Sequence, residues 1–228
     1  MTLKNPDKQN TSYHHGNLKQ ALVDAYLQLL HEFPVEKISL RKLASHVGVA
    51  ATAVYNHFPD KMALVVAVKL ECLGHFTRYL ESHAPDTLEP EVRIRVLGQS
   101  YYRYSIEHAQ YFERIFQEQV PDEYFTPELI NCVMSAEKAL RSAVLALLQK
   151  NNLPVNQYNE ALGTYACWSM AHGITALASK HMNHTACASG RWPEEFLLHN
   201  QTSVNNSFEA MTEILIQGIL VSARNHTD

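Results

Sequence analysis

Apolar residues recur at spacings of three and four along most of this chain, a period typical of amphipathic α-helices. The usual signals of β-strands, which are alternating Val, Ile and Thr runs and Gly-containing hairpin turns, are scarce. Clusters that contain Pro, Gly or Asn separate the helical segments; they lie at Phe33-Pro34, His83 to Pro90, Val120 to Pro127, Lys150 to Pro154 and His181 to Pro193. The pattern therefore predicts an all-α protein.

The N-terminal part predicts three short helices and the start of a long one. The first begins at about Asn17, its expected N-cap, and carries an apolar stripe from Leu18 to Phe33. The second follows the N-cap Ser39 and ends at Gly48, which tolerates the left-handed geometry of a C-terminal turn. Asp60 is the expected cap of the long helix, which runs to about residue 82.

The third predicted helix follows the second almost immediately. Val49, Val54 and Phe58 are expected to face inward, and small Ala44 stands where the two helices must approach closely. Two short helices joined by a turn at 46–49 form a helix-turn-helix pattern. On spacing alone, an ordinary helical hairpin fits equally well.

Specific residues favour the first alternative. The block Leu40-Arg41-Lys42-Leu43-Ala44, Val47-Gly48-Val49, Tyr55-Asn56-His57-Phe58 and Asp60-Lys61 closely resembles the DNA-binding domain of the TetR family, including its Tyr-x-His-Phe signature. The close resemblance covers residues 17–70. Tyr13 to Leu18 and Trp168-Ser-Met-Ala-His172-Gly173 resemble one TetR subgroup, whose C-terminal domain has a Trp/His-Gly motif. Ala50 departs from the family, which commonly has Ser or a similar cap there.

The resemblance implies that the third helix enters a major groove of DNA. The residues expected to meet base edges or phosphates are Arg41, Ala51, Thr52, Ala53, Tyr55, Asn56, His57 and Lys61. Plainer alternatives remain for some of them, because Tyr55 also fits a packing residue and Arg41 a solvated helix face. The arm around His14-His15 fits either a further DNA contact or a disordered polar tail.

Charge agrees with this placement. The formal net charge is -4, but residues 1–62 hold seven Lys or Arg against five Asp or Glu, and the remainder holds twelve against eighteen. Contact with nucleic acid is therefore expected at the N-terminal end. The absence of a secretory or membrane-spanning apolar stretch predicts a soluble cytoplasmic protein with no membrane partner.

No chemistry of another kind stands out. The four cysteines have no C-x-x-C pair, so neither a disulfide framework nor a zinc knuckle is expected. His181, His184 and Cys187 recur every three residues, but Gly190 and the Asn-rich surroundings argue against a closed metal site. With no H-E-x-x-H, G-x-S-x-G or phosphate-loop motif, we expect no catalytic residue, no metal and no cofactor, and hence no enzyme.

The segment after residue 90 is rich in aromatic residues. The candidates for lining a ligand pocket are Tyr101, Tyr104, Phe112, Phe116, Trp168 and His172. Aromatic residues at helical spacing are equally expected in an ordinary core. The resemblance implies that a pocket exists among these helices, but it does not say which face lines it.

Two late segments, Tyr158 to His181 and Val204 to Arg224, carry small and apolar residues on faces such as Ala161, Tyr165, Trp168, Ala171, Leu215 and Ile219. In the family such helices form a homodimer, and the alternative is the core of a single subunit. The expected organisation is a flexible arm at 1–16, a three-helix DNA-binding domain at 17–62, and a larger helical domain for ligand binding and dimerisation at 63–228.

These features together favour a transcriptional repressor that a small-molecule effector releases from a palindromic double-stranded DNA operator. Two alternatives remain within the same family likeness, a TetR-like activator and a DNA-binding dimer without a ligand. A further rival is a helical enzyme or scavenging protein that binds a small molecule and whose helix-turn-helix likeness is incidental. The effector, the operator and the regulated genes cannot be deduced from the sequence.

Overall fold

The structure, a computed structural model, describes residues 17–178, 193, 196–198 and 200–226. Every regular element in these ranges is helical, which confirms the predicted all-α class. Contacts divide the chain into two compact units, residues 1–68 and 69–228. This division falls within the long helix α4 (Lys61–His83), later than the boundary after residue 62 that the sequence suggests. The proposed arm at 1–16 lies outside the described residues.

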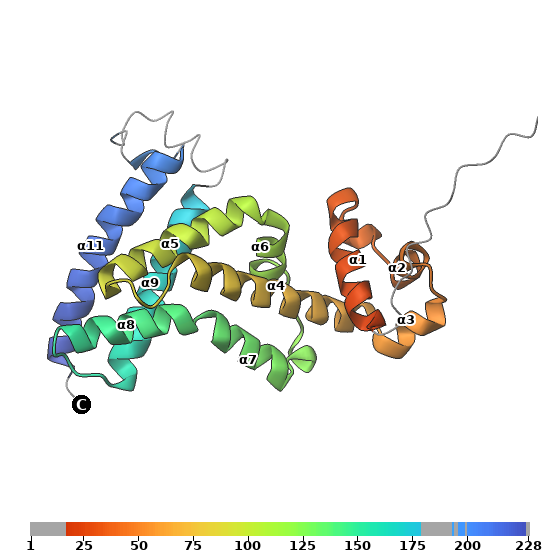
Figure 1. Ribbon diagram of the computed structural model, residues 1–228, viewed down its shortest axis with the longest axis horizontal. Helices are drawn as coiled ribbons and strands as arrows, with labels where there is room; N and C mark the ends of the chain where they lie inside the picture. Colours follow the sequence, from red (N-terminus) through yellow and green to blue (C-terminus); the bar gives the residue numbers. More distant parts are fainter. Residues whose placement is uncertain (1–16, 179–192, 194–195, 199, 227–228) are drawn as a thin grey trace, which may run out of the picture. The chain divides into compact units, whose positions relative to one another are not determined.

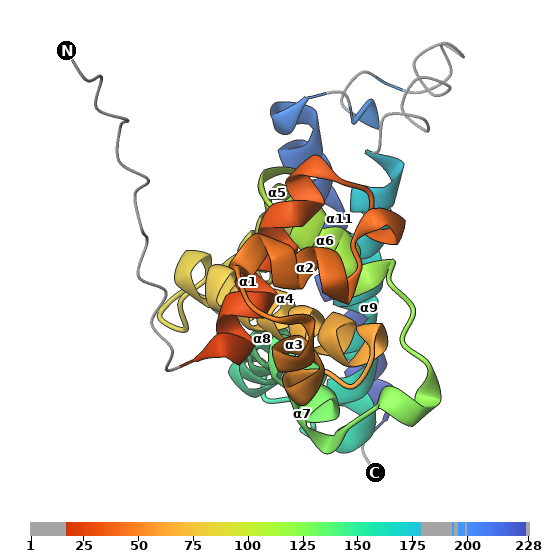
Figure 2. The same ribbon diagram turned by 90° about the vertical axis from the view of Figure 1, so that its right-hand side faces the viewer.

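The first unit is a small helical domain. It contains α1 (Leu18–Glu32), the short 3-10 helix η1 (Val35–Lys37), α2 (Leu40–Val47), α3 (Ala51–His57) and the first turns of α4. Helix α2 contacts both α1 and α3 (Figure 2). The core of this first unit is apolar and includes Leu22, Tyr26, Ile38, Leu43, Val54, Phe58 and Leu64. The predicted three-helix arrangement is therefore present.

The helix ends follow the local sequence. The Asn17 and Ser39 side chains accept hydrogen bonds from the backbone N–H groups of Gln20 and Lys42, both at 3.2 Å. The Asp60 carboxylate accepts one from Ala63 N–H at 2.8 Å. These bonds satisfy N–H groups that have no partner within the helix, so all three predicted caps are confirmed.

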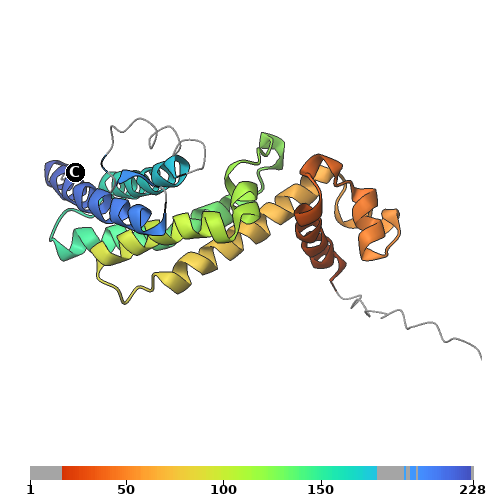
Figure 3. The same cartoon turned by 90° about the horizontal axis from the view of Figure 1, so that it is seen from above.

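The second unit is a larger bundle (Figure 1). It contains the rest of α4, α5 (Pro90–Glu107), α6 (Ala109–Phe116), the 3-10 helix η2 (Asp122–Tyr124), α7 (Pro127–Ala136), α8 (Lys138–Lys150), α9 (Gln157–Leu177) and α11 (Gln201–Asn225). Helices α5 and α9 pack on one another, and both contact α8 and α11. Figure 3 shows α9 and α11 side by side. No described helix is long and apolar enough to cross a bilayer.

A buried arginine, Arg93, joins three parts of this bundle through hydrogen bonds. The Arg93 Nε donates to the carbonyl oxygen of Ala84 at 3.1 Å, and its Nη1 donates to Ser142 Oγ at 2.7 Å. The side chain therefore ties α5 to the C-terminal end of α4, at the start of the α4–α5 connection, and to α8. Burying a charge is tolerated here because the guanidinium has hydrogen-bond acceptors.

Helix α9 approaches α8 and α11 most closely at Gly163. A Cβ atom there would lie 2.7 Å from Val144 Cγ1 and 3.5 Å from Ile219 Cγ2. Gly163→Ala is therefore expected to lower the free energy of unfolding by about 1–3 kcal/mol through overpacking. Gly173, on the same helix, has no atom within 4 Å of the corresponding position. Gly173→Ala is expected to be neutral or to stabilise by up to about 1 kcal/mol through helix propensity.

Urea unfolding of the two variants tests this difference, because both place the same side chain on the same helix. Equal stabilities for Gly163→Ala and Gly173→Ala would show that the close approach of α9 and α8 is incorrect.

Candidate nucleic-acid interface and apolar cavity

The turn between α2 and α3 is built on Gly48. Its φ of 77° lies in the left-handed region, where a side chain would be strained, and the N–H groups of Gly48 and Val49 both donate to the Ala44 carbonyl oxygen. Ala44 is buried, so its small side chain lets the helices approach. Helix α3 then begins at Ala51, as the helix-turn-helix pattern predicts.

Helix α3 has one buried and one exposed face. Val54 and Phe58 are buried and anchor the helix, whereas Thr52, Tyr55, Asn56 and His57 are exposed. Thr52, Tyr55 and Asn56 are three and four residues apart and therefore share a surface. The remaining two candidates on this helix, Ala51 and Ala53, are half-buried. The structure thus brings the polar candidates of α3 together on a solvent-facing surface.

The start of α3 has no side-chain cap. Ala50 has the extended backbone of an N-cap, with φ -65° and ψ 143°, but its methyl group accepts no hydrogen bond. Ala50→Ser is therefore expected to stabilise the first unit by about 1 kcal/mol, because the hydroxyl can accept from an N–H of the first turn. Ser39→Ala, which removes the cap of α2, is expected to cost about the same.

Thermal unfolding and amide hydrogen exchange of α2 and α3 check both changes. A destabilising Ala50→Ser substitution would contradict the N-cap geometry at this position.

Basic residues around α3 differ in their surroundings. Arg41 is exposed on the first turn of α2. The Lys61 Nζ instead donates to the Val35 carbonyl oxygen at 2.7 Å, which ties the start of α4 to η1. The Lys42 Nζ lies 2.8 Å from the centre of the Phe33 ring. The contact of Lys61 was not predicted, and it gives that residue a structural role whether or not it also meets a phosphate.

The second unit contains a cavity of about 440 Å³, within the range that holds small organic ligands. Helices α4, α5, α6, α7, α8 and α9 all contribute to its wall. Most of the lining is apolar and includes Leu73, Phe76, Leu97, Ile115, Leu129, Val133, Leu140 and Ala171. These helices therefore form an apolar cavity, partly open to solvent, within a single subunit.

Three of the six predicted aromatic candidates line this cavity, namely Tyr101, Phe116 and Trp168. Phe112 and His172 lie outside the lining and support it. The Phe112 and Phe116 ring centres are 4.6 Å apart, and the Tyr101 hydroxyl lies 2.7 Å from His172 Nδ1. Burial raises the pKa of the Tyr101 phenol, so this hydroxyl stays protonated at neutral pH.

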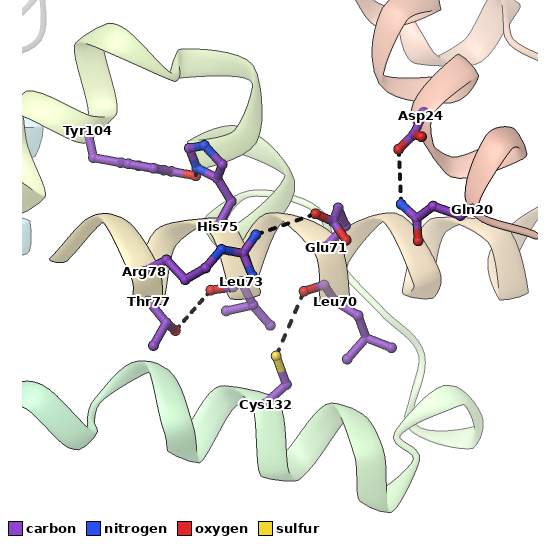
Figure 4. A network of polar contacts seen from close by, with 10 residues as sticks. All are labelled: Gln20, Asp24, Leu70, Glu71, Leu73, His75, Thr77, Arg78, Tyr104 and Cys132. Atoms are coloured by element: carbon purple, nitrogen blue, oxygen red, sulfur yellow. Dashed lines mark hydrogen bonds and ion pairs between the residues drawn. The ribbon is translucent and has the colours of Figure 1, made fainter. Parts of the chain in front are cut away.

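Tyr104 also lies outside the lining, in a cluster of aromatic rings. Its side chain is fully buried, and its hydroxyl lies 3.1 Å from His75 Nδ1 (Figure 4). The rings of Phe76, Tyr79 and His108 have their centres 4.9–5.1 Å from that of Tyr104. Tyr104 packs in this cluster because its side of α5 faces α4. The helical period of the sequence does not specify which neighbouring helix that side faces.

Charged side chains in the cavity wall are mostly paired. Arg141 donates to Glu137 at 2.6 Å and to Glu160 at 2.9 Å, and these hydrogen bonds raise the pKa of Arg141. The Lys69 Nζ donates to the Glu118 carbonyl oxygen at 2.9 Å, and burial lowers the pKa of Lys69. Sequence reasoning missed these residues, because no motif marks a charged residue that several distant helices enclose.

Helix α7 closes one side of the cavity with Leu129 and Val133. The Cys132 thiol, which lies between them in sequence, donates to the Leu70 carbonyl oxygen on α4 at 3.8 Å (Figure 4). The residues His181, His184 and Cys187, where the sequence argues against a closed metal site, lie outside the described residues.

Comparisons with known proteins agree with this architecture. Residues 22–68 match the sequence model of the family described as bacterial regulatory proteins, tetR family. The tetracycline repressor protein class D of Escherichia coli is 33% identical over 61 residues, and the nucleoid occlusion factor SlmA of Shewanella sp. (strain MR-4) is 40% identical over 45 residues. These alignments cover 27% and 20% of this chain. The chain spans only 28% and 23% of the lengths of the two relatives.

Solved structures extend the likeness to most of the chain. A protein of unknown function from Rhodococcus sp. RHA1 has a TM-score of 0.69 at 19% identity, covering 92% of this chain and 98% of its own. A tetR-family transcriptional regulator from Streptomyces coelicolor has a TM-score of 0.56 at 17% identity, covering 92% and 90%. The chain has the fold of TetR-family transcriptional regulators. The regulator PfmR from Thermus thermophilus is also similar, with a TM-score of 0.54 at 18% identity and coverages of 87% and 94%.

The matched residues 22–68 include the whole of α2 and α3. The TetR-type segment identified by sequence is therefore the same segment that folds as a helix-turn-helix. Membership of the subgroup with the Trp/His-Gly motif stays a prediction.

Proposed function

We propose that this chain is a TetR-family transcriptional repressor that binds a palindromic DNA operator as a homodimer and is released by a small-molecule effector. The observation that carries the proposal is the coincidence of the family match with a folded helix-turn-helix whose third helix exposes polar residues. A role in DNA-dependent regulation follows from that match.

The exposed face of α3 suits the major groove of DNA. Thr52 offers a hydroxyl and a methyl group to base edges, and Asn56 is placed to read a neighbouring base or bind the backbone. Tyr55 and His57 suit phosphate oxygens, and Arg41 adds a positive charge at the edge of the same domain. Because Ala51 and Ala53 offer only apolar contact, phosphate contacts and the spacing of two copies should carry much of the affinity.

A homodimer is supported by an uncovered apolar surface on α9 and α11, here called the α9/α11 face. It consists of exposed side chains spaced three, four or seven residues apart, which are Tyr158, Leu162 and Tyr165 on α9 and Met211, Ile214 and Val221 on α11. Large apolar surfaces of this kind mark interaction sites. Two copies joined through it form a four-helix interface with two-fold symmetry, which suits a palindromic operator.

The sequence placed the dimer face partly elsewhere. Ala171 and Ile219, which it assigned to this surface, are buried within the subunit. Tyr165 and Trp168 from the same prediction are exposed. Gly218 and Leu162 border a shallow groove of about 180 Å³ between α9 and α11, into which side chains of a second copy can pack.

The cavity is the proposed binding site of the effector. Helix α4 can transmit the effect of binding, because it belongs to both units. The same helix begins in the DNA-binding unit at Lys61 and lines the cavity with Leu73, Phe76 and Leu80. A ligand that favours one position of α4 changes the spacing of the two recognition helices, which must be roughly 34–36 Å apart to fit successive grooves. A coupling of about 1–3 kcal/mol changes operator occupancy by about 5- to 150-fold.

Selection of DNA from a random library, followed by affinity measurements at several salt concentrations, tests the proposal. We expect a palindromic site to be enriched. Tyr55→Ala should weaken binding to all sequences by about fivefold, as expected for one lost phosphate contact. Thr52→Ala should reduce the free-energy difference between the preferred base and the other bases at one operator position by about 1 kcal/mol.

Salt-dependent affinity without any preferred sequence would contradict a specific repressor, because counterion release alone produces that behaviour. If Thr52→Ala changed neither affinity nor preference, the assignment of the α3 surface to the groove would be wrong.

A second candidate is a DNA-binding dimer that needs no effector. The likeness to the nucleoid occlusion factor SlmA covers only 20% of this chain and agrees equally with such a dimer. The apolar cavity favours the ligand-released repressor instead. Addition of effector candidates to the selected protein–DNA complex distinguishes the two, since a dimer of the second kind stays bound.

A further inference from the structure

One polar group in the cavity wall has no partner. Thr164, on α9, lines the cavity and is only 4% exposed, and its Oγ1 makes no hydrogen bond. Other buried side-chain atoms of the described residues also lack a partner, but Thr164 is the one among those residues that borders the cavity. A buried hydroxyl without a partner costs free energy, so this site is improved by a ligand that supplies one.

The position of Thr164 makes such a contact accessible. In helices the threonine side chain divides between two χ1 rotamers, so its hydroxyl can take two positions without any change in the backbone. Thr164 is a lining residue of the cavity, although its hydroxyl oxygen is buried in the structure. A ligand is therefore expected to reach this hydroxyl through a rotation of the Thr164 side chain, with no movement of α9.

The charged groups and the Tyr101 hydroxyl in the wall already have partners. Arg141 is shared by two carboxylates, and the hydroxyl of Tyr101 is paired with His172. One guanidinium and two carboxylates leave a net negative charge at the Arg141 side, which disfavours an anion there. A cation would lose its water among apolar side chains without gaining a free carboxylate at Arg141. The wall is thus suited to a ligand without charge.

Aromatic side chains add a preference in shape. The rings of Phe76, Tyr101, Phe116 and Trp168 all border the cavity, and rings pack favourably against other rings. We propose that the cavity binds a neutral, mainly aromatic molecule whose single hydrogen-bonding group pairs with the Thr164 hydroxyl. This inference rests on the proposed function only in taking the cavity as the effector site.

A matched series of biphenyls tests the inference by calorimetry on the full chain without DNA. The probes are biphenyl, biphenyl-4-methanol, 4-acetylbiphenyl, biphenyl-4-carboxylate and the ammonium form of biphenyl-4-methylamine. We expect the two neutral polar probes to bind about 3- to 10-fold more tightly than biphenyl, the gain of one net hydrogen bond. The two charged probes should bind more weakly than biphenyl.

Two substitutions isolate the hydroxyl. Thr164→Val replaces it with a methyl group of similar size and should bring the affinities of biphenyl-4-methanol and biphenyl within about twofold of each other. Thr164→Ser retains a hydroxyl and should preserve the difference. Because the lost hydroxyl has no partner in the free protein, Thr164→Val should unfold at a temperature no lower than that of the unmodified chain.

The principal rival ligand is an anion bound at Lys69, whose ammonium donates to the Glu118 backbone carbonyl oxygen. The proposal would be overturned if biphenyl-4-carboxylate bound most tightly of the five probes and lost this advantage in Lys69→Met. An unchanged preference in Thr164→Val, or a failure of all five probes to bind, would also overturn it. The selection of DNA from a random library does not depend on these probes. If the probes contradict the ligand inference, the repressor proposal still stands. If no preferred operator is found, the result for the cavity still stands.

Discussion

Tyr165→Glu combined with Ile214→Glu is expected to convert the proposed dimer into a monomer. Both side chains lie in the α9/α11 face and are 65% and 67% exposed in the single subunit. In a two-fold interface each substitution occurs twice, so four unpaired carboxylates would be buried. Each costs several kcal/mol, and we expect the dissociation constant of the dimer to rise by at least about 1000-fold.

The loss of the dimer should also abolish tight operator binding. A monomer engages one half-site, and the gain from a linked second site is typically about 10²- to 10⁴-fold. Light scattering after gel filtration gives the oligomeric state, and a binding titration with the selected operator gives the affinity. The helical content should be unchanged, because both side chains are solvent-exposed within the subunit.

A double variant elsewhere controls for added charge. Ile106→Glu with Ile130→Glu makes the same kind of change at exposed positions on α5 and α7, outside the α9/α11 face. We expect it to stay dimeric and to bind the operator. Monomers from both double variants would show that charge alone, rather than the proposed interface, causes dissociation. A dimer that persists in Tyr165→Glu/Ile214→Glu would refute this interface.

Local features of the fold were predictable from the sequence because few residues determine them. The caps at Asn17, Ser39 and Asp60 each need one short polar side chain near the first N–H groups of a helix, and the structure contains all three bonds. Gly48 is similar, since a left-handed residue after α2 requires glycine. The position of α3 follows directly from these signals.

The cavity could be predicted only in part, because its wall comes from six helices. Helical spacing places Tyr101 and Tyr104 near one another on α5, but only contacts with α4, α6 and α9 decide that Tyr101 borders the cavity. Thr164 has no sequence signal at all, since its significance comes from the absence of a partner in the folded chain. Pairing and burial depend on tertiary packing, which periodicity does not specify.

Tyr104→Ala is expected to destabilise the second unit strongly. The Tyr104 side chain is fully buried among the rings of His75, Phe76, Tyr79 and His108. Its removal leaves a cavity that these rings can fill only partly, and substitutions of this kind cost about 3–5 kcal/mol. Tyr104→Phe should cost only about 1 kcal/mol, because it keeps the ring and loses the contact with His75 Nδ1.

Two measurements distinguish the structural Tyr104 from Tyr55, the proposed DNA-binding residue. They are denaturant unfolding, which reports the stability of the second unit, and operator affinity. Tyr55→Ala removes a side chain that is 48% exposed and should change stability by no more than about 0.5 kcal/mol, while it weakens DNA binding. Tyr104→Phe should give the opposite result, with reduced stability and unchanged operator affinity. If Tyr104→Ala were as stable as the unmodified chain, the aromatic cluster would not be a packed core. The residue would then be free to take the ligand-binding role that its sequence position suggested.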